Sequence, residues 1–122
     1  MEISALRGAI CVPEDRPESI VASMGKLWEC LLGENQLSEE DIAFVLITQT
    51  GDLKSKNPAG ALRSLGYCPT TPLFCMQELE ITGMLEKVIR VMLVLKKEPK
   101  HPHPVYLDGA EKLRPDLLLK TT

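Results

Sequence analysis

Four arginines in or beside apolar segments are the residues best suited to chemistry in this chain: Arg7, Arg63, Arg90 and Arg114. A guanidinium group stays charged and binds a carboxylate or phosphate through a planar fork. One such arginine is often a satisfied structural residue, whereas several that converge would form a site for a small anion. Glu78 could neutralise one of them, so a structural glutamate–arginine pair is the main alternative.

The usual motifs of nucleophilic, acid–base or metal catalysis are missing from the sequence. It has no glycine-rich phosphate loop, no nucleophile elbow and no Cys-x-x-Cys pair among its four cysteines. Its two histidines, His101 and His103, stand in a Pro- and Lys-rich connection and are more typical of loop residues than of metal ligands. We therefore expect no metal and no cofactor. An enzyme built this way would work by orientation and electrostatics.

Two predicted strands carry the central arginine and its candidate partner. The segment Val88–Lys96 is almost wholly apolar except for Arg90 and its last residue, Lys96. Alternation makes both of its faces apolar, which is typical of a central strand covered on both sides, where an arginine needs a partner. Pro72–Glu80 predicts a second central strand that contains Glu78, and a short Thr-Gly connection would join the two strands.

Two other arginines lie on predicted elements where they could simply be exposed to solvent. Ile3–Val12 predicts a strand in which Arg7 stands between two alanines, and an edge strand with Arg7 in water is an equal alternative. Asn57 followed by proline predicts the start of a short helix that runs through Leu65. Arg63 on this helix would, by itself, be a solvated surface residue.

The remaining elements predict one α+β domain over residues 1–122. Asp15–Leu32 has apolar residues at the helical period, Ile42–Thr50 predicts a buried strand and Val105–Leu107 a short one. The resulting order β-α-β-α-β-β-β gives a small mixed sheet with one long and one short helix. Because so few helices leave one sheet face partly uncovered, we expect subunits to cover each other in an oligomer.

Composition excludes several classes of partner. The net charge is −3 and aromatic residues make up 4% of the chain, which argues against nucleic acid. No segment has the length of apolar sequence that a membrane span needs, and the N-terminus lacks the pattern of a signal peptide. The simplest expectation is a cytoplasmic protein with reduced thiols.

Six segments, in this order and spacing, resemble the monofunctional AroH class of chorismate mutases: LRGA (6–9), NPAGALR (57–63), CMQELEITG (75–83), IRVM (89–92), VYL (105–107) and LRPDL (113–117). The resemblance implies a homotrimer of small α+β domains with a pseudo-α/β-barrel core and active sites between subunits. It also implies the conversion of chorismate to prephenate by an intramolecular Claisen [3,3] rearrangement in phenylalanine and tyrosine biosynthesis, without a cofactor.

The same resemblance implies roles for particular residues. Arg90 would donate to the ether oxygen of chorismate and to the adjacent carboxylate, and Glu78 would accept from the ring hydroxyl. Cys75 would be a polar contact, although a regular strand places it on the opposite face from Glu78 unless the strand ends near Gln77 or bulges. The substrate-binding residues implied by the resemblance are Arg7, Arg63, Leu73, Phe74, Cys75, Arg90, Tyr106 and Arg114.

Some positions depart from the pattern of this class, and other functions stay open. Asn57 replaces the usual aromatic residue, Gly60 an often charged one, and Phe74 a small polar one. The alternative function is a non-catalytic trimeric module that senses a small carboxylate. A different trimeric enzyme, such as an imine deaminase, is disfavoured by the CMQE and IRVM segments. We also expect a tail over about 115–122 that is flexible.

Overall fold

The computed structural model describes residues 3–116, and these form the α+β domain that the sequence predicts. Most of the expected tail, residues 117–122, lies outside the described residues. The elements in chain order are β1 (Ser4–Cys11), α1 (Pro17–Glu34), the short 3-10 helix η1 (Glu39–Asp41), β2 (Ile42–Gln49), α2 (Pro58–Ser64), β3 (Leu73–Gln77), β4 (Val88–Leu95), β5 (Val105–Leu107) and the 3-10 helix η2 (Ala110–Leu113).

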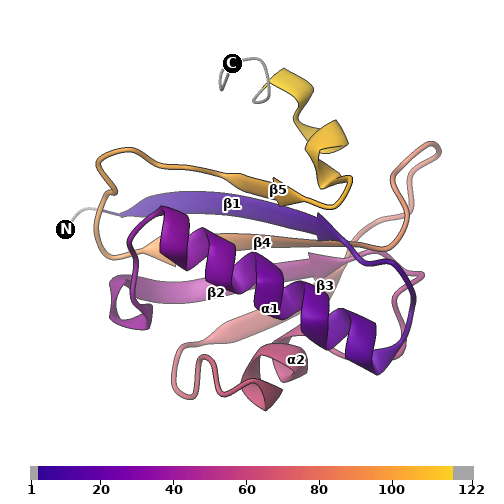
Figure 1. Ribbon diagram of the computed structural model, residues 1–122, viewed down its shortest axis with the longest axis horizontal. Helices are drawn as coiled ribbons and strands as arrows, with labels where there is room; N and C mark the ends of the chain where they lie inside the picture. The colour runs from indigo at the N-terminus through magenta and orange to yellow at the C-terminus, as the bar shows by residue number, and fades with distance from the viewer. Residues whose placement is uncertain (1–2, 117–122) are drawn as a thin grey trace.

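The five strands form one mixed sheet in the order β3-β2-β4-β1-β5 (Figure 1). β4 is antiparallel to both β1 and β2, whereas β3 runs parallel to β2 and β5 runs parallel to β1. The prediction of a short connection between two central strands is wrong, because β2 lies between β3 and β4. A tight hairpin needs adjacent strands, so residues 78–87 cross the end of β2 instead and β3 becomes an edge strand.

β1 is an inner strand, and the alternative that placed Arg7 on an edge is therefore wrong. β5 pairs with β1 over Gly8–Ile10 and covers the edge that β1 would otherwise expose. The loop before β5 is held by Asn35 at the end of α1, whose side chain accepts from the backbone N–H of His103 and donates to its carbonyl oxygen. This fixed loop brings Tyr106 to the sheet.

Both α-helices pack on the same face of the sheet (Figure 1). The inward side of α1 buries large apolar residues, among them Met24, Leu27, Trp28 and Leu31. None of the described helices is long and apolar enough to cross a membrane. The expectation that the β4 strand is covered on both faces fails within one chain, whereas the expectation of a partly uncovered sheet is confirmed.

The face without α-helices, which we call the uncovered face, is closed only at one end. There η2 covers a small apolar cluster of Ala9, Val88 and Ala110. Farther along, large apolar side chains remain in solvent: Phe44 is 41% exposed and Phe74 is 61% exposed. The uncovered face therefore has an exposed apolar surface and, at one end, a part that η2 covers.

Candidate active site

Strand register brings residues from all five strands into one row on the uncovered face. The cross-strand partners of this row, from β3 to β5, are Met76, Thr48, Arg90, Ala9 and Tyr106. The next row contains Phe74, Leu46, Met92 and Arg7. Because side chains of like parity share a face of a sheet, Arg7 and Arg90 point to the same side on neighbouring strands.

Glu78 faces Arg90 because it has the same parity as Phe74 and Met76, which point to the uncovered face. β3 stops at Gln77, and the backbone N–H of Glu78 donates to the carbonyl of Gln49 at 2.9 Å. The Glu78 carboxylate then accepts from Arg90 Nε and contacts Arg90 Nη2. The strand does end at Gln77, but Cys75 still lies on the opposite face from Glu78, so neither of the two explanations offered brings these side chains together.

The pair of Arg90 and Glu78 is asymmetric in its contact with solvent. The Glu78 side chain is 9% exposed, whereas the Arg90 side chain is 51% exposed. An arginine carries five N–H donors, so Glu78 orients the guanidinium without using all of them. Arg90 is thus held in place and still open to an anion.

A cavity of about 400 Å³ surrounds this pair and gathers five of the predicted site residues. We call it the arginine cavity; its charged and polar members include Arg7, Glu78, Arg90, Tyr106 and Arg114. Its apolar lining includes Leu46, Met76, Met92 and Leu113.

Arg114 is held at the edge of the arginine cavity by two neighbours. Its Nε and Nη2 donate to the two carboxylate oxygens of Asp116 at 3.1 and 2.9 Å. Hydrogen bonding to Asp116, with a smaller effect of Tyr106, raises the pKa of Arg114, so its charge persists at every physiological pH.

The structure does not bring the other four predicted residues into this cavity. Cys75 and Leu73 pack against the helix-side core, and Arg63 is exposed on α2. Phe74 lies on the uncovered face but not in the cavity lining. The predicted site therefore separates into two sets of residues within one chain.

Cys75 and Arg63, which we call the Cys75–Arg63 group, belong to one local structure. The Cys75 thiol donates to Asn57 Oδ1 at 3.4 Å, next to the start of α2. Burial raises the pKa of Cys75, and the Ala59 backbone N–H and the charge of Arg63 only partly oppose that rise. The thiol therefore stays protonated near neutral pH, as a polar contact requires.

Sequence reasoning missed several lining residues, and the strand register explains why. Strand alternation along β4 is enough to put Met92 on the same face as Arg90. Thr48 and Leu46 lie on β2, which the sequence did not place beside β4. No sequence signal identified this neighbour, because the pairing of strands distant in the chain is set by the packed sheet.

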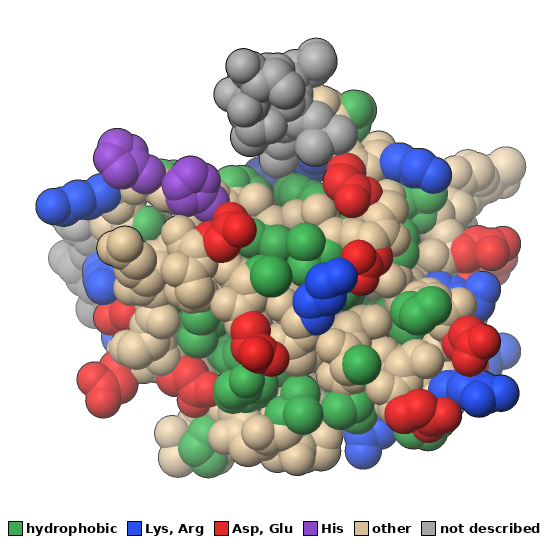
Figure 2. Space-filling model, viewed as in Figure 1, with side chains coloured by type: hydrophobic (Ala, Val, Ile, Leu, Met, Phe, Trp, Pro, Cys, Tyr) green, Lys and Arg blue, Asp and Glu red, His purple; other side chains and the backbone are tan. Residues whose placement is uncertain are grey.

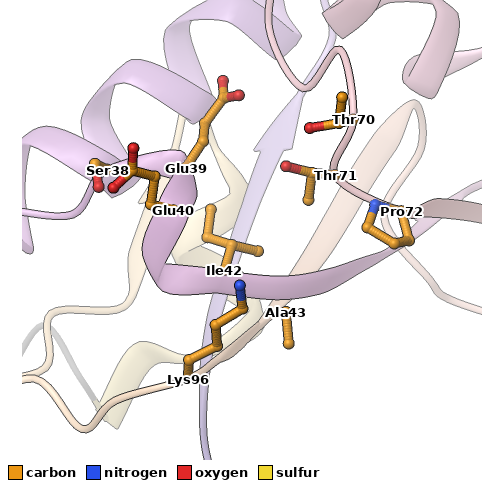
Figure 3. Close-up of a pocket in the computed structure, with 9 residues that line it drawn as sticks. All are labelled: Ser38, Glu39, Glu40, Ile42, Ala43, Thr70, Thr71, Pro72 and Lys96. Atoms are coloured by element: carbon orange, nitrogen blue, oxygen red, sulfur yellow. The ribbon is translucent and has the colours of Figure 1, made fainter.

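A second cleft, of about 700 Å³, lies near the start of β2 (Figure 3). Its Glu39 carboxylate accepts from the backbone N–H of Cys68, at 3.0 Å through each oxygen. Ser38 and Asp41 form a capping box beside it. With two glutamates and one lysine in its lining, this cleft repels anions more than it attracts them, and its polar groups already serve the local fold.

The face that bears the helices carries acidic and basic side chains interspersed (Figure 2), whereas arginines gather in the cavity on the uncovered face. Within residues 3–116 no group of three or more potential metal ligands occurs. The described residues thus form a small α+β protein with a cavity that three arginines line.

Comparison with known proteins identifies the family. The model of the family "Chorismate mutase type I" matches residues 3–117. Chorismate mutase AroH of Bacillus subtilis is 38% identical over 121 residues, which covers 98% of this chain and 95% of that protein. Chorismate mutase AroH of Thermus thermophilus is 38% identical over 118 residues, with 94% and 96% covered.

A solved structure agrees with these relatives. Chorismate mutase from Clostridium thermocellum superposes with a TM-score of 0.82 at 40% identity, over 89% of this chain and 98% of that one. The chain belongs to the chorismate mutase type I family, and it is therefore an isomerase of aromatic amino-acid biosynthesis. The resemblance predicted from the six sequence segments is confirmed.

Proposed function

We propose that the chain converts chorismate to prephenate in a site made by the arginine cavity of one subunit and the Cys75–Arg63 group of a second copy. The observation that carries this proposal is the cavity itself, in which Arg90, held by Glu78, lines the same open space as two further arginines. Chorismate carries two carboxylates, and guanidinium forks suit both.

The rearrangement needs no group that the chain lacks. Within one molecule, the ether C–O bond breaks while a new C–C bond forms, so no proton or electron enters or leaves. The C–O bond breaks early, and negative charge gathers on the ether oxygen. A fixed cation at that oxygen lowers the barrier, because the cation is already in place where charge develops.

The roles in this proposal are those that the family resemblance implies, and the positions of the side chains support them. Arg90 donates to the ether oxygen and to the neighbouring carboxylate, and Arg7 with the Tyr106 hydroxyl binds the side-chain carboxylate. Glu78 orients Arg90 and accepts from the ring hydroxyl. Arg114 lies at the entrance of the site and attracts the dianion, and Asp116 keeps its guanidinium in position. By holding the enolpyruvyl arm over the ring, these contacts also supply the orientation that the reaction needs.

A second copy would complete the site and cover the apolar face. Within one chain Cys75 lies on the helix side of the sheet, away from the arginine cavity. Phe44, Phe74 and Met76 leave 41%, 61% and 38% of their surface exposed, and such a surface favours burial between subunits. We propose a homotrimer in which the three uncovered faces form a central barrel-like core. We also propose that residues 1–122 act as a single domain in the cytoplasm.

The test is to incubate the purified chain with chorismate and identify the product. Prephenate should form catalytically, and Arg90→Ala should lose at least about a hundredfold in rate, the cost of removing one such donor. Light scattering should give three times the chain mass for both proteins, which keeps loss of activity separate from loss of assembly.

Three outcomes would contradict parts of this proposal. Wild-type activity in Arg90→Ala would exclude the mechanism, and a monomer with full activity would exclude the shared site. Tight binding of chorismate without turnover would instead support a sensor of small carboxylates.

A further inference from the structure

One amide oxygen joins the two elements that carry the Cys75–Arg63 group. Asn57 Oδ1 accepts from the backbone N–H of Ala59 at 2.8 Å and from that of Gly60 at 3.1 Å. The same oxygen accepts from the Cys75 thiol at 3.4 Å. The side chain of Asn57 is therefore an N-cap for α2 and, at once, a direct link from α2 to the edge strand β3.

The small size of α2 makes this link important for Arg63. The helix has seven residues, and its first is Pro58, which has no N–H to donate. The Asn57 oxygen thus meets the first two N–H groups of the helix. Arg63 lies in the last turn, so the direction in which α2 leaves its cap decides where the guanidinium stands.

We propose that Asn57 is a positioning residue that sets the distance between Cys75 and Arg63, so that both reach chorismate as one unit. This inference rests on the proposed function. The strand supplies the thiol, the helix supplies the cation, and Asn57 Oδ1 is the atom that touches both elements. The reacting bonds lie with Arg90 and Glu78 in the other subunit's half of the site, so the link governs substrate binding more than the chemical step.

Substitutions at Asn57 separate the cap from the link. Asn57→Ala removes both the cap of α2 and the link to Cys75. Asn57→Ser keeps a hydroxyl that can cap α2, but the shorter side chain no longer reaches the Cys75 thiol. We expect both variants to raise KM for chorismate about threefold to tenfold, the effect of one net hydrogen bond, with kcat within about twofold of wild type. Asn57→Ser should recover most of the melting temperature that Asn57→Ala loses.

A matched control removes a cap elsewhere. Ser38 caps η1 through its box with Asp41, close to the second cleft and outside the arginine cavity. Ser38→Ala should lower the melting temperature and leave KM unchanged. In a Cys75→Ala background, adding Asn57→Ser should raise KM no further, because the link has already lost one partner.

The KM values of these variants decide whether Asn57 positions the Cys75–Arg63 group or only caps α2. An unchanged KM in both Asn57 variants, with normal wild-type turnover, would overturn this inference alone and leave Asn57 as a cap. Additive effects of Asn57→Ser and Cys75→Ala on KM would overturn it too. A wild-type chain that neither binds nor converts chorismate would overturn the proposed function, and this inference with it.

Discussion

Arg90 carries its charge on the central strand of a five-stranded sheet and not on a loop. Its backbone is fixed by β1 on one side and β2 on the other. Its side chain is fixed by Glu78, itself only 9% exposed. A cation held in this way needs little reorganisation when charge develops beside it, which is the condition for electrostatic catalysis.

Geometry at position 90 can be tested separately from charge. Arg90→Lys keeps one positive charge but loses the planar fork that meets Glu78 and an anion together. We expect kcat to fall by at least about tenfold, yet less than in Arg90→Ala, since the ammonium still offers charge stabilisation. Steady-state kinetics on both variants measure this, and equal kcat values for Arg90→Lys and wild type would show that charge alone suffices.

The hydroxyl of Tyr106 gives a second prediction at the residue scale. It lies in the arginine cavity, one strand beyond Ala9 in the row that contains Arg90. If Tyr106 binds the substrate as proposed, Tyr106→Phe removes one hydrogen bond to it, a loss of about 0.5–1.5 kcal/mol. We expect KM to rise about twofold to tenfold with a smaller effect on kcat. A fall in kcat alone would place the hydroxyl at the reacting bonds instead.

Two glycines in the elements around the site should respond oppositely to the same substitution. An added Cβ at Gly8 in β1 would lie 2.8 Å from Leu31 Cδ1 and 3.1 Å from the backbone oxygen of Val105. At Gly60 in α2 the nearest atoms would be 3.9 Å away. Gly8→Ala should therefore lower the unfolding free energy by about 1–3 kcal/mol, and Gly60→Ala should raise it by up to about 1 kcal/mol. Urea unfolding measures both, and a change of equal sign would contradict the packing described here.

At the scale of elements, local sequence patterns predicted the helices well but did not predict which strands pair. The helical period of α1 and the Asn57-Pro58 start of α2 were enough to place both helices within a few residues. The position of β3 at the edge was not predictable, because a parallel partner leaves no turn signal near it. The same limit applies to the site: alternation put Met92 beside Arg90, but only the assembled sheet shows that Thr48 faces Arg90 from β2.

The molecule as a whole should lose stability in alkali through Cys68. This thiol is fully buried, and burial with the charge of Glu39 raises its pKa to about 11. In the unfolded chain the pKa of this thiol is about 8.5. At a pH between these two pKa values, the folded state therefore holds a proton that the unfolded state has lost. Stability is then full below the unfolded pKa and falls as pH rises toward the folded one.

The measurement is urea unfolding from pH 7 to 10.5 on wild type and Cys68→Ala. The wild type should lose stability with a steeper slope than the variant, although the variant starts lower because it leaves a cavity. Parallel slopes would mean that other groups control the alkaline limit.

The resemblance in six sequence segments carried the identity of the family, because those segments hold the residues that meet in the cavity. It left open which chain supplies each residue of the site. The structure adds that Cys75 packs on the helix side of the sheet, whereas Glu78 lines the arginine cavity.

The separation of the Cys75–Arg63 group from the arginine cavity has a genetic consequence. If each site joins two chains, an Arg90→Ala chain can still lend its Arg63, and an Arg63→Glu chain can still lend its Arg90. In randomly mixed trimers about one site in four would receive both intact halves. Cells without their own chorismate mutase should then grow without phenylalanine and tyrosine when they express both defective copies, and fail with either alone. Two defective alleles would thus together make a working enzyme. If each site were confined to one chain, cells that express both defective copies would not grow.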